Sequence, residues 1–161
     1  MHEVSECLNK ANKLLKTADH LVYVTYPLVK DNKIIITITD NLLDAMTNAM
    51  EALLKYDKYY KRIQYLPEDF KSKLEMFKTS CAPRYKLNMA SLSLINDLKD
   101  LQDLRKKSTM EFSRNDKYII TQENFNVKTL TYQKVKDWVN LSKSFFEKIN
   151  FILKNVENQR S

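Results

Sequence analysis

The residues that could carry acid–base or nucleophilic chemistry are few in this chain and lie far apart in its sequence. The two histidines are His2, near the start, and His20, which follows Asp19 in a predicted helix. The two cysteines, Cys7 and Cys81, form no Cys-x-x-Cys pair. A lone helical histidine is far more often a surface or interior residue than a catalytic base. We therefore expect no enzymatic activity, and we interpret the cysteines as small buried thiols rather than a disulfide.

Metal and cofactor sites find little support in the residue types present. The two cysteines and two histidines lack the close spacing of zinc ligands, with no Cys-x-x-Cys pair among them. Asp97, Asp100 and Asp103 recur every three residues, which could form a metal-binding stripe, but a solvated helix face explains them better. Glycine is absent from all 161 residues, so the glycine-rich loops that hold nucleotide phosphates are not available. We expect neither a metal nor a cofactor.

Positive charge is the strongest chemical bias of the chain. The formal net charge is +7, and lysine supplies 22 of the 27 basic residues. Dedicated phosphate and RNA clamps favour the fork of arginine, whereas lysine is a solubilising point charge. The dispersed lysines therefore favour a solvated surface, although the charge permits contact with nucleic acid or anionic surfaces.

One short segment, residues 55–62, interleaves tyrosines with basic residues. Tyrosines that stack on bases beside lysines that pair with phosphates would suit single-stranded nucleic acid. Equally, basic residues complement the dipole at a helix C-terminus, and tyrosines there can lie between core and solvent. Both interpretations stay open. The nucleic-acid interpretation assigns the contacts to Lys55, Lys58, Tyr59, Lys61 and Arg62.

The elements that must position these residues are predicted to be helices. Apolar residues recur at alternating steps of three and four, which is typical of amphipathic helices. The β-branched run at 34–39 has strand propensity, but the helical period that follows it favours a helix. The predicted helices span residues 4–25, 33–64, 67–80, 87–107 and 132–157.

Proline, asparagine and aspartate mark the predicted helix boundaries. Tyr26-Pro27 closes or kinks the first helix, because the residue before proline avoids the helical region. Asp31-Asn32 caps the second helix, and Pro67 occupies the first turn of the third. Pro83 breaks the chain after that helix.

The stretch before the last helix predicts a small β-hairpin. Two strand-like runs, 110–113 and 118–121, flank a polar turn at 114–117. Residues 122–124 then turn the chain again before 125–127. Thr131 is the predicted N-cap of the last helix.

The last helix has an unusually wide apolar face. A heptad stripe runs from Val135 to Val156, and Val139, Phe146 and Leu153 flank it. Such a face must be covered by other helices or by a second subunit. We therefore predict a homodimer through part of the last helix or of the first.

Residues 104–112, the hairpin and the Thr131-capped helix together resemble the closing third of HEPN-superfamily domains. Those domains are helical bundles of about this size, and many serve toxin–antitoxin or RNA-processing systems. Active members carry an Arg-x-x-x-x-His motif that cleaves RNA across a dimer. In this chain Arg105 matches the arginine, Lys106 stands at the usual polar position, and Met110 replaces the histidine. Because methionine has no proton to exchange, the resemblance does not imply RNase activity.

These features predict one all-α domain over residues 1–161, a five-helix antiparallel bundle with a small β-hairpin before the last helix. No apolar run approaches the ~18 residues of a membrane span, and the N-terminus lacks the order of a signal peptide. We therefore expect a cytoplasmic protein without membrane contact. Its expected function is a non-catalytic, HEPN-like interaction module for a protein partner or a second copy. The alternative is a sequence-tolerant RNA-binding protein, and an RNase with an unrecognised site ranks last.

Overall fold

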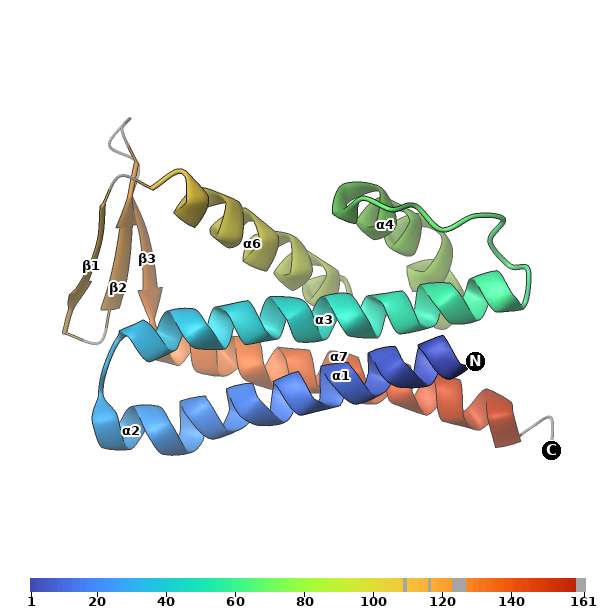
Figure 1. The fold of residues 1–161 in the computed structure, drawn as a ribbon, viewed down its shortest axis with the longest axis horizontal. Coiled ribbons are helices and arrows are strands. Elements are labelled where there is room, and N and C mark those ends of the chain that lie inside the picture. Colours follow the sequence, from blue (N-terminus) through green and yellow to red (C-terminus); the bar gives the residue numbers. More distant parts are fainter. Residues whose placement is uncertain (109, 116, 123–126, 159–161) are drawn as a thin grey trace.

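The computed structural model describes residues 1–108, 110–115, 117–122 and 127–158. Within them, five helical rods form a bundle, and a small sheet lies at the end opposite the two chain termini (Figure 1). The mostly helical architecture with a β element before the last helix is therefore confirmed. The elements, in chain order, are α1 His2–His20, η1 Leu21–Thr25, α2 Tyr26–Val29, α3 Lys33–Tyr59, α4 Phe70–Met76, η2 Phe77–Cys81, α5 Ala82–Tyr85, α6 Met89–Lys106, β1 Met110–Arg114, β2 Lys117–Thr121, β3 Val127–Thr131 and α7 Tyr132–Asn158.

Neither proline in a helical rod stops its rod, contrary to the prediction for Pro83. The first rod is α1, η1 and α2, and the third is α4, η2 and α5. In each, a π-helical turn comes directly before the short helix whose first turn holds Pro27 or Pro83. The residue before each proline donates its N–H five residues back, Tyr26 to Leu21 and Ala82 to Phe77. This wider turn lets the helix pass a residue that has no N–H to donate.

Two other predicted boundaries are wrong by several residues. The second helix ends at Tyr59 rather than near residue 64, because the chain turns through Lys61 at a φ of 58°. The third rod begins at Phe70, where the Asp69 side chain accepts a bond from the first turn, so Pro67 precedes the helix. The run 34–39 is helical, as predicted.

Of the two residues predicted to cap α3, only one does so. Asp31 Oδ1 accepts the N–H of Lys33 at 3.0 Å, so Asp31 acts as a cap. The Asn32 side chain makes no capping bond and is buried. It accepts a hydrogen bond from the Tyr26 hydroxyl at 2.7 Å and donates to the carbonyl of Lys117 at 3.3 Å. Asn32 therefore attaches the β element to the helices.

The predicted hairpin is part of a three-stranded antiparallel sheet in the order β1-β2-β3. Phe112 of β1 pairs with Ile119 of β2, which pairs with Thr129 of β3. The third strand was not predicted, and the turn expected at 122–124 lies partly outside the described residues. Thr131 caps α7 as predicted, since its Oγ1 accepts the N–H of Lys134 at 3.1 Å.

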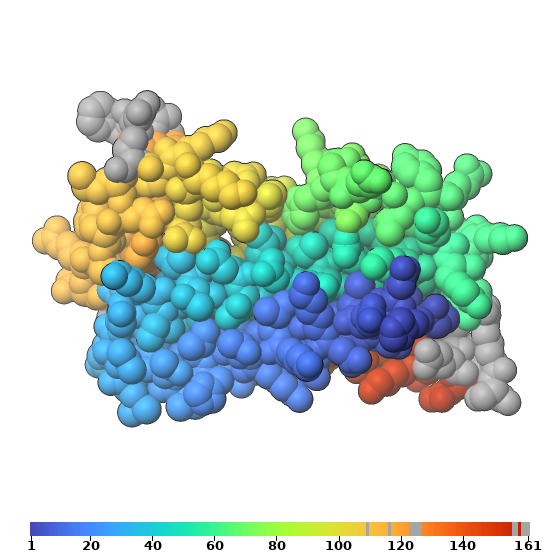
Figure 2. Space-filling model, viewed as in Figure 1, coloured from blue at the N-terminus to red at the C-terminus, as the bar shows by residue number. Residues whose placement is uncertain are grey.

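The core is built around α3, which packs against both α1 and α7. Its fully buried side chains include Leu42, Met46, Met50 and Leu53. In Figure 2, α1 lies along α3, and part of α7 emerges beneath the start of α1. Within the described residues, no helix combines the length and apolarity that crossing a bilayer requires.

Candidate functional site

Arg105 of the degenerate motif lies at the junction of α3, α6 and the sheet. Its Nη1 is 3.5 Å from Asp40 Oδ2, and its Nε is 3.3 Å from Glu111 Oε1. Tyr118 donates its hydroxyl to Glu111 Oε2 at 2.6 Å. Burial raises the pKa of Asp40, although the positive charge of Arg105 opposes this shift. Met110, the other motif position, is 60% exposed on β1. Arg105 therefore holds the sheet to the bundle, and Met110 adds no proton donor or acceptor beside it.

The predicted nucleic-acid contacts lie at or near the surface, but Arg62 is engaged within the molecule. Lys55, Lys58 and Tyr59 line one surface hollow of about 270 Å³, and Tyr59 is 60% exposed. Lys61 is exposed at the turn after α3. Arg62 is exposed as well, with its side chain 31% accessible, but its guanidinium lies over tyrosine rings and pairs with Asp57.

A polar cluster around Asp57 was not predicted from the sequence. This carboxylate is fully buried at the end of α3. It accepts hydrogen bonds from Arg84 Nη1, from the Tyr85 hydroxyl, from Cys81 Sγ at 3.2 Å and from Arg62 Nη1 at 3.3 Å. The cluster joins the third rod to α3. The helical spacing could have indicated the burial of Asp57, since this residue continues the apolar stripe of α3 four residues after Leu53.

Cys81 has a nucleophilic side chain, but its surroundings keep it inert. Burial raises the pKa of its thiol, and the neighbouring Asp57 carboxylate raises it further. The thiolate is the reactive form of cysteine, so this thiol stays protonated and donates to Asp57. Cys7 and Cys81 are both buried and unpaired, as predicted.

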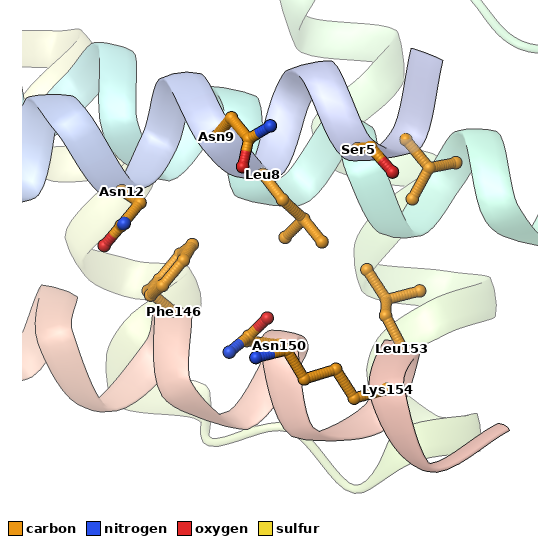
Figure 3. Close-up of a pocket in the computed structure, with 9 residues that line it drawn as sticks. Ser5, Leu8, Asn9, Asn12, Phe146, Asn150, Leu153 and Lys154 are labelled. Carbon is orange, nitrogen blue, oxygen red and sulfur yellow. The ribbon is translucent and has the colours of Figure 1, made fainter. Parts of the chain in front are cut away.

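Hydrogen bonds and an ion pair join the first and last helices at one end, and a groove lies between them toward the other. Near η1, the hydroxyl of Tyr23 donates to Asn140 Oδ1 at 2.9 Å, and Lys143 forms an ion pair with Asp19. Toward the two chain termini a groove of about 310 Å³ opens between α1 and α7 (Figure 3). A second hollow of about 290 Å³ shares Asn12 and Phe146 with it, so the depression continues along the helices.

The groove combines apolar side chains with carboxamides. Leu8 on α1 and Phe146 and Leu153 on α7 form its apolar walls, and Figure 3 shows open space between them. Three asparagines also line it, and none of their side chains makes a hydrogen bond within the described residues: Asn9, Asn12 and Asn150. A carboxamide both donates and accepts. The groove therefore suits another polypeptide better than a charged ligand.

Phe151 lies outside this groove on the same helix. Its side chain is 62% exposed, whereas Phe145 is buried in the core and Phe146 is half-buried. On a helix, residues three and four apart are neighbours, so Phe151 adjoins Lys154 and Glu147, which line the two hollows. An exposed aromatic side chain thus stands at the rim of an open groove.

Comparisons with protein-family models, with curated proteins and with solved structures found no match for this chain.

Proposed function

We propose that this chain is a non-catalytic interaction module, of HEPN-like helical-bundle type, that forms a homodimer through the α1–α7 groove. The observation that carries the proposal is the exposed Phe151 at the rim of an open groove on its own helix. In a two-fold contact, each copy presents the same surface to the other. Phe151 of each copy would then fill the groove of its partner.

The composition of the groove supports a protein contact. Aromatic anchors that enter pockets dominate binding energy in many protein interfaces, and charged residues are depleted from interface cores. Only Lys154 contributes a charge to the first hollow. Its walls of leucine, phenylalanine and asparagine fit an interface in which side chains pack and pair with amides.

Sedimentation equilibrium tests the homodimer. We expect the unaltered chain to be dimeric at high micromolar concentration and Phe151→Asp to be monomeric. Leu28→Asp is the matched control, because Leu28 is 81% exposed at the other end of the first rod and should leave the dimer intact. A monomer at high micromolar concentration would contradict the proposal.

The second candidate function is RNA binding, and the hollow formed by Lys55, Lys58 and Tyr59 favours it. Binding of single-stranded RNA should fall steeply as salt rises. The lysines displace cations from the RNA phosphates when they bind, and a higher salt concentration opposes that release. It should also fall with Lys58→Ala combined with Tyr59→Ala. A dimer held by apolar packing should instead persist in high salt. Fluorescence anisotropy with labelled RNA at several salt concentrations separates the two functions.

The absence of catalysis is part of the proposal. We expect the purified chain to leave RNA intact with or without divalent metal, because Met110 stands at the position of the motif histidine and has no proton to exchange. Robust RNA cleavage that His20→Ala abolishes would overturn this assignment.

A further inference from the structure

Three aliphatic side chains are exposed together where the first rod ends. Val24, Leu28 and Val29 are 45%, 81% and 61% exposed, and they lie at the corner where α2 leads into α3 (Figure 1). Single exposed apolar residues, such as Met89 on α6, are normal on a protein surface. A cluster of them is more often a site of contact.

Basic side chains surround this corner. Lys30 and Lys33 are exposed on either side of the turn into α3. The turn between β1 and β2 adds the exposed Arg114 and Lys117. This second turn lies beside the first, because the Asn32 carboxamide donates to the carbonyl of Lys117 at 3.3 Å. Four cations from two distant segments therefore lie close to the exposed aliphatic side chains.

These four cations have no counter-charge within the described residues. Asp31, which lies between two of them in sequence, caps α3 through its Oδ1. Arg114 and Lys117 are directly opposite each other in the sheet, and like charges in such a pair repel. Unpaired lysines occur elsewhere on this chain too, so the distinguishing feature is that these cations surround an apolar cluster. An anionic surface that also accepts aliphatic side chains would satisfy both.

We propose that this end of the molecule binds the surface of an anionic lipid bilayer. Val24, Leu28 and Val29 would enter the headgroup region, and the cations around them would pair with lipid phosphates. The contact is with one leaflet only. The expectation of no membrane contact rested on the lack of a spanning segment, and binding at a bilayer surface needs none.

The residue types favour a lipid surface over two other partners. Lysine is depleted from protein–protein interfaces, where aromatic side chains and arginine are enriched. Single-stranded nucleic acid is bound by aromatic side chains that stack on its bases, and valine and leucine have no ring to stack. A bilayer surface accepts aliphatic side chains and attracts lysine and arginine alike.

Co-sedimentation of the full chain with vesicles tests the site. The vesicles contain phosphatidylcholine alone or phosphatidylcholine with phosphatidylglycerol, and we expect tight binding only to the anionic ones. Leu28→Ser should weaken that binding about tenfold, because a buried aliphatic side chain is lost. Lys30→Gln should weaken it about fivefold, as expected for one charge near an anionic leaflet.

Two matched controls remove the same kinds of group elsewhere. Met89→Ser removes an apolar side chain that is 69% exposed on α6, and Lys154→Gln removes an exposed charge near the opposite end of the molecule. Each should change binding less than about twofold, because neither group lies near the proposed contact and distant charges are screened. All four altered side chains are exposed, and circular dichroism checks that the variants keep their helices.

Several outcomes would overturn the site. Failure of the unaltered chain to bind anionic vesicles at low salt would exclude it, whatever the variants do. Equal losses in Lys30→Gln and Lys154→Gln would mean that the net charge of +7 attracts vesicles to any face. If Leu28→Ser weakened RNA binding and not vesicle binding, this end would be a nucleic-acid contact. The site does not rest on the proposed dimer, because the α1–α7 groove opens toward the other end of the molecule.

Discussion

Two segments of the molecule, residues 21–30 and 77–86, have the same backbone design and different attachments. Each begins with a π-helical turn, η1 or η2, and continues into a four-residue helix with proline in its first turn. Each ends at a lysine in the left-handed region, Lys30 with a φ of 53° and Lys86 with a φ of 54°.

In the first segment, neutral groups hold the short helix α2. The Tyr26 ring stacks on Tyr132 with a centroid distance of 4.4 Å, and its hydroxyl donates to Asn32. The second segment is held by charge, since Arg84, Tyr85 and Cys81 all bond to the buried Asp57. The same backbone turn is thus attached by different residues, and these attachments set how each segment responds to mutation and pH.

The largest expected effect is the loss of stability when the charged attachment of the second segment is broken. Asp57→Ala removes the only described carboxylate that pairs with Arg62 and Arg84, and breaking a buried pair costs about 3–5 kcal/mol. Urea unfolding measures the loss. Asp19→Ala, which breaks the half-exposed pair with Lys143, is the control and should cost about 1 kcal/mol or less. Equal losses would contradict the buried role of Asp57.

Asn32→Ala tests the neutral attachment. Without the carboxamide, the Tyr26 hydroxyl and the carbonyl of Lys117 each lose one hydrogen bond, which should cost about 1–3 kcal/mol. Amide hydrogen exchange in β2 should accelerate at the same time. Asn140→Ala removes the exposed bond to Tyr23 and should leave exchange in β2 unchanged. A loss larger than that of Asp57→Ala would reverse the comparison.

Alkaline pH should weaken the charged attachment. Burial and Asp57 raise the pKa of both the Cys81 thiol and the Tyr85 hydroxyl. The unfolded chain therefore ionises first, and stability that is complete below pH about 9 declines as pH rises, by up to ~1.4 kcal/mol per pH unit for each group. Urea midpoints at pH 8 and 10 measure the decline. Cys81→Ala should make it shallower, and an unchanged slope would exclude Cys81 as a source.

The smallest expected effect tests whether the two left-handed corners, the turns at Lys30 and Lys86, are equivalent. A left-handed conformation is strained for lysine and free for glycine. Lys30→Gly and Lys86→Gly should therefore each stabilise the fold by about 0.5–1 kcal/mol, seen as a higher melting temperature. Lys33→Gly, in the first turn of α3, should instead destabilise it, because glycine lowers helix propensity. A gain at only one corner would show that the segments differ in backbone strain as well.

The sequence predicted those parts of the fold that depend on apolar spacing. The five helical rods follow three-four periodicity, and Thr131 caps α7 as expected. It failed at Pro83 because a π turn depends on which N–H finds which carbonyl, and residue type does not specify that. Arg62 was assigned to a nucleic-acid contact, but its guanidinium pairs with Asp57, a charged residue in an apolar stripe. The α1–α7 groove depends on how the two helices pack together, which neither helix encodes alone.

The left-handed corners have a consequence for how this chain can change over time. Lys30, Lys61 and Lys86 stand where glycine would relieve strain. Lysine codons begin with AA and glycine codons with GG, so no single-nucleotide change converts one residue to the other. The intermediates encode arginine or glutamate, and neither relieves the corner. A stabilising substitution at each corner is therefore separated from the present sequence by a step without benefit, and the strain can persist through long periods of selection.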